Sequence, residues 1–176
     1  TTTFDADNTA VGFNAMVSLT TGTRNVAIGS GALDAADDDS RNVAIGYGAL
    51  SAMDTGNSTP YNVAVGYQAG TTITTGLFNT FVGGLAGDAS DDGSSNTAVG
   101  YAALSANAGS NNTALGSLAL QATTGTLNTG LGKQAGLSIT SGEQNTIVGA
   151  NAGDALTEGN ANTVLGYEAL GADTLG

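Results

Sequence analysis

The sequence predicts an all-β fold, a parallel β-roll or β-solenoid of about ten coils. A motif with the consensus G-x-x-N-[TV]-A-[VIL]-G-[YS]-x-A-[LG] recurs ten times, mainly at a spacing of 17 residues. Its Asn-to-Gly segment alternates with a period of two and is rich in β-branched residues, which favours a short strand. A unit this short cannot bury a face by itself, whereas stacked copies can. We therefore expect one repeat domain over residues 1–176.

The Asn of the motif begins each expected strand. The ten positions are Asn8, Asn25, Asn42, Asn62, Asn79, Asn96, Asn112, Asn128, Asn145 and Asn162. In stacked coils, identical amides lie one strand spacing apart and can hydrogen-bond along the stack, and an Asn can also cap a turn. Both roles are structural, and a ligand role is the third alternative. The residues one and three positions after the Asn are Val or Thr and Val, Ile or Leu, and we expect them to fill a narrow interior.

A Gly ends each expected strand four positions after the Asn, where a turn with positive φ is expected. These are Gly12, Gly29, Gly46, Gly66, Gly83, Gly100, Gly116, Gly132, Gly149 and Gly166. Another seven of the 28 glycines lie three positions before an Asn. The glycine content is therefore positional, and a flexible linker is excluded.

An Ala stands seven positions after each Asn, in what we expect to be a second short strand with close packing. These are Ala15, Ala32, Ala49, Ala69, Ala86, Ala103, Ala119, Ala135, Ala152 and Ala169. Each coil should add about 4.8 Å along the axis, the spacing of paired strands. The unit from Asn42 to Asn62 has three extra residues and the only proline, Pro60. Its irregular region, residues 53–60, is expected to form a loop outside the stack.

The composition excludes several classes of function. The 176 residues include no Cys and no His, and 3 Lys plus Arg stand against 15 Asp plus Glu, a net charge of −12. Disulfides, Cys/His metal sites and His-based catalysis are excluded. A basic surface for nucleic acid or anionic membranes is missing, and no apolar run is long enough to cross a bilayer. Lys133 and the carboxylates are the only groups left for catalysis, and no carboxylate pair stands out, so we expect no enzyme.

The repeat resembles a known family at its strand segments. Asn25-Val26-Ala27-Ile28-Gly29 and the matching segments from Asn42 and Asn62 resemble the head repeats of trimeric autotransporter adhesins. The longer form, residues 96–104, resembles repeats of bacteriophage tail fibres. The resemblance implies a left-handed parallel β-roll in which three chains associate side by side. The adhesin repeat is nearer 14 residues, so a repeat of mainly 17 implies a wider coil.

From the resemblance we expect a homotrimeric structural and recognition protein, a segment of a longer fibre. It would serve host attachment as part of a virion tail fibre or a cell-surface adhesin, outside the cell, with a host glycan or protein receptor as its partner. No nucleic acid and no membrane insertion are expected. A monomeric solenoid with the same coils is the alternative assembly. The alternative function is a stand-alone ligand-binding β-solenoid, for ice or for glycans in a calcium-dependent manner.

Two acidic clusters lie in the variable stretches, and we expect no cofactor other than calcium there. They comprise Asp34, Asp37, Asp38, Asp39, Asp88, Asp91 and Asp92. Carboxylates are the hard ligands that Ca²⁺ prefers, although the spacing matches neither an EF-hand loop nor a calcium-binding nonapeptide repeat. The alternatives are solvated acidic turns that keep the rod soluble, and ion pairs with Arg24 and Arg41.

Aromatic residues occupy the position after the repeat Gly. Phe13, Tyr47, Tyr67, Tyr101 and Tyr167 are expected to line one edge of the rod. The four tyrosines are candidates for glycan contact, because a tyrosine ring offers an apolar face and a polar tip. The alternative is that these rings cover the turn or the seam between chains.

Seven of the ten residues after the repeat Asn are threonines. They are Thr9, Thr80, Thr97, Thr113, Thr129, Thr146 and Thr163. A flat array of outward Thr side chains can order water and bind ice. Val26, Val43 and Val63 occupy the same column, and because Val and Thr share a shape this exchange also suits a packed site. The direction in which the column faces decides between the two.

Overall fold

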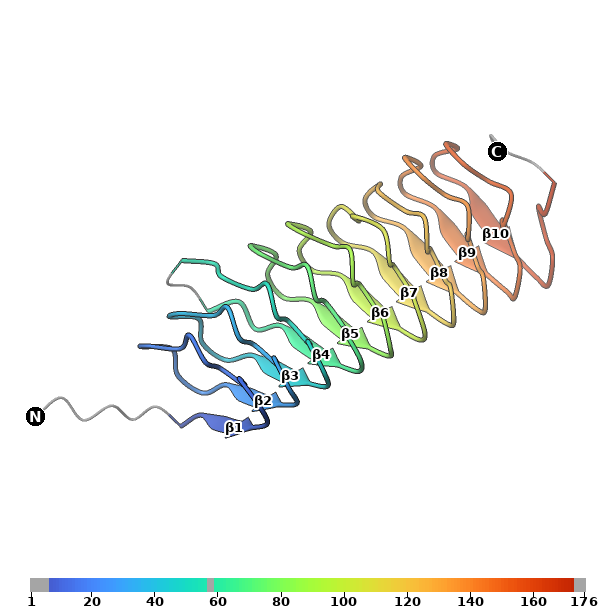
Figure 1. Cartoon of the computed structure of the whole chain (residues 1–176). Coiled ribbons are helices and arrows are strands. Elements are labelled where there is room, and N and C mark those ends of the chain that lie inside the picture. The colour runs from blue at the N-terminus through green and yellow to red at the C-terminus, as the bar shows by residue number, and fades with distance from the viewer. Residues whose placement is uncertain (1–6, 57–58, 173–176) are drawn as a thin grey trace, which may run out of the picture.

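The computed structural model describes residues 7–56 and 59–172 as a stack of coils with one three-residue strand per coil (Figure 1). The strands are β1 (Thr9–Val11), β2 (Val26–Ile28), β3 (Val43–Ile45), β4 (Val63–Val65), β5 (Thr80–Val82), β6 (Thr97–Val99), β7 (Thr113–Leu115), β8 (Thr129–Leu131), β9 (Thr146–Val148) and β10 (Thr163–Leu165). All ten belong to one parallel sheet, in chain order. The β-solenoid with a repeat of about 17 residues is therefore confirmed. In these ranges the chain forms no helix that could cross a membrane.

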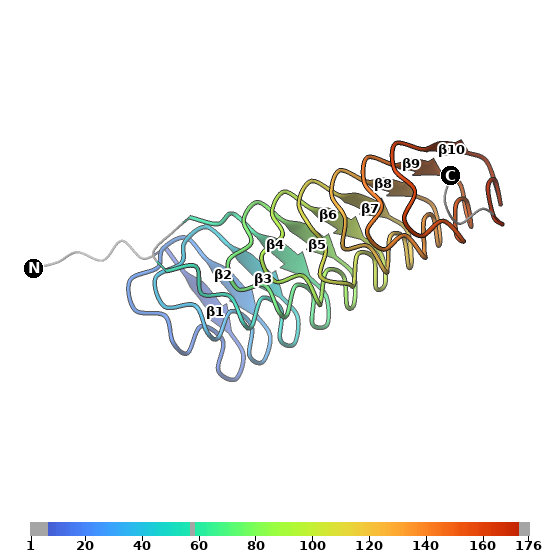
Figure 2. The ribbon, with the colours of Figure 1, turned by 90° about the horizontal axis from the view of Figure 1, so that it is seen from above.

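Each strand pairs in register with the same segment of the next coil. Val26 lies opposite Val43 and Ile28 opposite Ile45, and the other pairs follow this pattern. The hydrogen bonds continue on both sides of the strand: the Val26 N–H donates to the Asn42 carbonyl at 2.8 Å. Seen from above, the coils form an elongated rod with the strands side by side along one wall (Figure 2).

The assignment of the two strand faces from sequence was wrong. The middle residue of the strand points inward, and Ala27, Ala44 and Ala98 are fully buried, while the Val, Thr, Ile and Leu residues beside them point outward and are half-buried or exposed. A strand with apolar residues on both faces does not reveal which face is inside, and a shift of one residue exchanges them. The narrow interior selects the smaller side chains.

The expected second strand is also absent from the described residues. The Ala column lies in turns that follow the sheet, although its members from Ala32 to Ala152 are fully buried, as close packing requires. The next residue in each coil has a positive φ, for example 53° at Leu33 and 49° at Leu50. A residue in this left-handed conformation cannot continue a strand.

The core keeps its volume by exchanging large and small residues between columns. Most strands bring an Ala inward and are followed by a buried Leu, such as Leu50 or Leu104. Where the strand brings in Phe81, the Leu position holds Gly87, and a Cβ on Gly87 would lie 2.6 Å from the Phe81 ring. Close packing to a fixed volume explains why the apolar pattern varies between coils while the fold does not.

The long coil between β3 and β4 packs more closely than expected. Met53 and Pro60, at the two ends of the stretch predicted to lie outside the stack, are both buried. The Nδ2 of Asn62 lies 3.4 Å from the Met53 Sδ. Asp39, from the preceding coil, accepts hydrogen bonds from the backbone N–H and the hydroxyl of Thr55. The extra residues are thus anchored to the core at both ends.

Candidate binding surfaces

The Asn column is the internal frame that positions every surface of the rod. The Oδ1 of each Asn accepts a hydrogen bond from the backbone N–H of the Asn in the next coil, at 2.8–3.0 Å through all nine steps from Asn8 to Asn162. The predicted ladder is therefore confirmed, with the backbone as the main partner. Direct amide-to-amide bonds also occur, as between Asn145 Nδ2 and Asn128 Oδ1 at 3.0 Å.

The amide nitrogen of the same Asn ties the next coil at a second point. Asn79 Nδ2 donates to the Gly93 carbonyl at 2.8 Å, and Asn128 Nδ2 to the Gly142 carbonyl at 2.8 Å. These glycines stand three positions before the next Asn, so one side chain fixes both the start of a strand and the turn that leads into it. The eight asparagines from Asn25 to Asn145 are fully buried. Their role is structural, and they are closed to a ligand.

The Gly column brings the backbones of successive coils together. At all ten positions φ lies between 128° and 143°, a conformation that side chains rarely adopt, so the expected positive-φ turn is confirmed. A Cβ on Gly116 would lie 2.5 Å from the Gly132 carbonyl oxygen, and one on Gly100 would lie 2.6 Å from the Gly116 carbonyl. The column therefore requires glycine for conformation and for space.

The outer face of the sheet is an apolar surface that runs the length of the rod. Of the 16 exposed large hydrophobic side chains, 14 lie in three columns: the third strand position, the position after the repeat Gly and the position before the repeat Asn. None of the ten first or ten third strand residues is charged. We call the first and third strand positions the outer face. Soluble monomers rarely expose a contiguous apolar patch of this kind, which typically marks an interaction surface.

The tyrosines predicted to line one edge of the rod do so. Tyr47, Tyr67, Tyr101 and Tyr167 are all exposed, and Phe13 continues their column. The rings of Tyr47 and Tyr67 stack, with centroids 5.6 Å apart and planes 12° apart. The column borders the outer face where the strands end. A glycan contact by these rings remains a prediction.

A second group of aromatic residues was missed from the sequence. Tyr61 and Phe78 precede the repeat Asn, stack with centroids 6.0 Å apart and are exposed beside the outer face. The Arg41 guanidinium lies over the Tyr61 ring, 5.5 Å from its centroid. The signal was available, because the position before the Asn is a fixed repeat position. Its positive φ in every described coil turns the side chain outward.

The Thr column faces outward, which settles the question that the sequence left open. Thr113, Thr146 and Thr163 are exposed, and Thr80 and Thr97 are half-buried at the surface. The valines of the same column also lie on the outer face. The packed interior site that the Val–Thr exchange suggested is therefore wrong for the single chain.

The acidic clusters bond to neighbouring coils. Asp37 accepts a hydrogen bond from the Thr20 hydroxyl, and Asp91 accepts one from Thr74; in both cases the threonine stands one coil earlier at the same repeat position. Within residues 7–56 and 59–172, no three acidic side chains converge on a point that could hold a metal ion. Hydrogen bonds between coils are thus a structural role for part of these clusters, and calcium binding remains a prediction.

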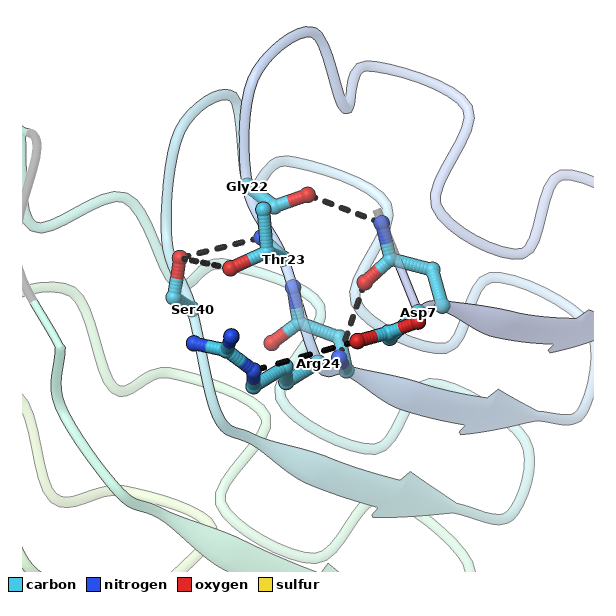
Figure 3. A network of polar contacts seen from close by, with 7 residues as sticks. Asp7, Gly22, Thr23, Arg24 and Ser40 are labelled. Atoms are coloured by element: carbon cyan, nitrogen blue, oxygen red, sulfur yellow. Dashed lines mark hydrogen bonds and ion pairs between the residues drawn. The ribbon is translucent and has the colours of Figure 1, made fainter. Parts of the chain in front are cut away.

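The arginines do not pair with the acidic clusters as the sequence suggested. In the described part of the chain the one ion pair joins Arg24 Nε to Asp7 Oδ2 at 3.9 Å, and both side chains are exposed (Figure 3). Beside it, the Thr23 N–H donates to the Ser40 hydroxyl at 3.0 Å, which links successive coils two positions before the Asn. Exposed pairs of this kind contribute little to stability, so hydrogen bonds between coils dominate here.

Two carboxylates of the clusters are perturbed by burial. Burial raises the pKa of Asp39 above its usual 3.8; hydrogen bonds from Thr55 lower it, and the nearby charges of Asp38 and Asp54 raise it. Burial also raises the pKa of Asp88, against backbone hydrogen bonds that lower it. The native protein therefore binds more protons than the unfolded chain between pH 3.8 and the raised pKa values. Its free energy of unfolding should rise as the pH falls through that window.

Asp39→Asn should flatten this pH dependence. The amide can still accept a hydrogen bond from the Thr55 N–H, but it carries no charge to be desolvated. We expect an equal or higher melting temperature at pH 7 and a smaller gain on acidification towards pH 4, measured by circular dichroism. Asp92→Asn, at an exposed position, is the control for the change in net charge. An unchanged slope in Asp39→Asn would contradict the assignment.

Comparisons of the chain with protein families, with curated protein sequences and with solved structures gave no significant match. The function is therefore inferred from the repeat and from the surfaces of the rod.

Proposed function

We propose that the protein is a structural and recognition rod, a homotrimeric segment of a bacteriophage tail fibre or surface adhesin that serves host attachment outside the cell. The observation that carries the proposal is the apolar outer face, which extends over all ten strands with aromatic columns on both flanks. The resemblance of the repeat to adhesin heads and phage fibres supports the same conclusion.

Further copies of this chain are the partners that suit the outer face best. Every copy carries the same columns at the same coil spacing, so side chains that meet in one coil also meet in the next. The outer face itself is uncharged, and the 15 acidic residues of the chain all lie elsewhere, so the net charge of −12 does not oppose contact along this face. Closed rotational symmetry is the usual arrangement for such self-association.

The turns that leave the sheet supply the recognition part of the proposal. The frame of Asn and Gly columns is the same in every coil, whereas the residues between the Ala column and the next Asn differ from coil to coil. A rigid scaffold that presents variable turns is typical of binding proteins. One side of the rod would therefore join the copies and the other sides would meet a host receptor or glycan.

The native mass tests the assembly. We expect a mass of about three times 17.0 kDa by light scattering or native mass spectrometry at micromolar concentration. Val65→Lys combined with Val99→Lys places two charges on the outer face and should give a folded monomer, because charges buried without partners are strongly unfavourable. The core residues Ala64 and Ala98 are untouched, so the circular dichroism spectrum should not change.

The control places lysines on exposed turns away from the outer face. Thr21→Lys combined with Ser141→Lys adds the same charge and should keep the trimeric mass. A wild-type protein that is monomeric at these concentrations would overturn the trimer, and so would an outer-face variant with an unchanged mass.

A second candidate function is favoured by one observation, the outward direction of the Thr column. An uncovered, flat outer face with in-register threonines suits a monomeric ice-binding solenoid. A monomeric mass together with thermal hysteresis that disappears in Thr113→Lys would establish this alternative in place of the fibre. A trimer without thermal hysteresis would exclude it.

A further inference from the structure

We propose that a depression on the turn edge of the first four coils binds neutral pyranose sugars. The inference rests on the proposed function, for which it names a ligand class and a site. The depression has a volume of about 320 Å³, and Phe13, Asp34, Tyr47 and Gln68 are among the residues that line it. It lies beside the outer face, among residues that follow the ends of β1 to β4, so that copies packed on the outer face would leave it open.

Two glycines in consecutive coils open the depression. The position six after the repeat Asn has a positive φ in every coil, and in most coils it carries an outward side chain, such as Leu85 or Leu118. Gly31 and Gly48 occupy this position in the second and third coils, with φ of 64° and 61°. A Cβ on Gly48 would make only ordinary contacts, the nearest at 3.6 Å. The fold therefore accepts side chains here, and the two glycines act by leaving space.

An aromatic ring borders this space. Tyr67 stacks on one face of Tyr47, so that the other face of Tyr47 is turned towards the coil that carries Ser30. Ser30 occupies the same column and is small, and Phe13 continues the column on its far side. A pyranose ring has an apolar face formed by its C–H groups, and a tyrosine or phenylalanine ring is the surface on which such a face packs.

Polar groups border the space on the opposite side. Asp34, Ser51 and Thr71 stand nine positions after their repeat Asn in successive coils, and all three line the depression. The Ser51 and Thr71 hydroxyls lie 3.0 Å apart. Among the described residues, Asp34 Oδ1 has no hydrogen-bond partner, so no contact within this part of the chain neutralises the carboxylate there. The amides of Asn14 and Gln68 lie at the two ends.

This combination selects the ligand class. A concave site with an aromatic wall and a few convergent polar groups is typical of small-ligand pockets, which range from roughly 300 to 1,000 Å³. A carboxylate, two hydroxyls and two amides suit a ligand with many hydroxyl groups. The unpaired Asp34 and the net charge of −12 disfavour an anionic ligand. Neutral hexose rings meet these requirements, whereas uronic and sialic acids do not.

Saturation-transfer NMR of the native protein with lactose and with cellobiose tests the site. We expect transfer to the ring protons of at least one of the two sugars. Gly48→Leu should weaken that binding by about tenfold or more, because it fills the space with a side chain that the same column holds at Leu85 and Leu118. Tyr47→Ser should weaken it to a similar extent, since Ser30 and Ser117 show that the column accepts serine.

Matched controls lie in the same columns, outside the depression. Ala102→Leu enlarges the side chain at the column position of Gly48, and Tyr101→Ser repeats the change made at Tyr47; both should bind like the wild type. Digalacturonate should bind at least about tenfold more weakly than the neutral sugar, because its carboxylates meet Asp34. Absence of transfer to both neutral sugars, or equal binding by the wild type and Gly48→Leu, would overturn the site.

The native mass of the same samples separates this inference from the proposed function. A trimer that binds neither sugar would overturn the sugar site alone. A monomer that binds sugar with the expected variant pattern would overturn the trimer and leave the site standing.

Discussion

Gly100→Ala should destabilise the protein by about 4 kcal/mol, among the largest effects of any single methyl group in this chain. Gly100 has a φ of 135°, which only glycine adopts at low cost, and the added Cβ would lie 2.6 Å from both the carbonyl carbon and the carbonyl oxygen of Gly116. These atoms are backbone atoms of the next coil, so the methyl group can be accommodated only by separating two coils. Denaturant unfolding, followed by circular dichroism, measures the loss.

The matched control for this change is the glycine that follows the repeat Gly of the preceding coil. Gly84 has no positive φ, and a Cβ there would meet only the Tyr101 ring at 3.8 Å, an ordinary contact. Gly84→Ala should therefore change the free energy of unfolding by less than about 0.5 kcal/mol. Amide hydrogen exchange should locate the defect of Gly100→Ala between the coils of β6 and β7. Equal effects of the two substitutions would show that backbone contact between coils is not the constraint.

Asn112→Ala should cost about 2–6 kcal/mol, because two buried backbone groups lose their partners at about 1–3 kcal/mol each. The Asn128 N–H donates to Asn112 Oδ1 at 2.9 Å, and the Gly125 carbonyl accepts from Asn112 Nδ2 at 3.0 Å. Both groups belong to the next coil, so the loss is one of contact between coils. Denaturant unfolding measures the total, and hydrogen exchange of the Asn128 amide reports the broken bond directly.

An exposed Asn supplies the comparison for this deletion. Asn107 accepts one hydrogen bond from the Asp91 N–H at 3.1 Å in an exposed turn, where water can replace it. Asn107→Ala should cost less than about 1 kcal/mol. If Asn112→Ala were no more costly than Asn107→Ala, the Asn column would not be the frame of the rod.

The repeat columns made much of the fold predictable. The spacing of Asn, Gly and Ala indicated a solenoid with one parallel strand per coil, because stacked coils bring the same position of each repeat into close contact and so require small residues there. The direction of the strand faces was not predictable by the same reasoning. Ala98 lies inside and Val99 outside, which reverses the usual preference, because the interior is narrow and the outward face is large enough to pack against other molecules.

Backbone conformation hid the remaining features from the sequence. Residues such as Leu33, Gln68 and Phe78 adopt positive φ, although nothing in their chemistry favours it. These conformations replace the expected second strand by turns and place the second aromatic group at the surface. The tyrosine edge of the candidate site followed from repeat position alone. The depression did not, because Gly31 and Gly48 count as missing side chains only once the column is known to point outward.

The direction of the hydrogen bonds between coils has a mechanical consequence. The Asn Oδ1 bonds and the strand bonds all link one coil to the next along the rod, so tension applied at the two ends loads the interfaces between coils one after another. When one interface opens, the 17 residues of a coil extend to about 60 Å. The rod should therefore lengthen in nearly equal steps under a pulling force, with a longer step at the coil of Met53 and Pro60. Such a molecule absorbs a sudden load by releasing single coils while the rest stays folded.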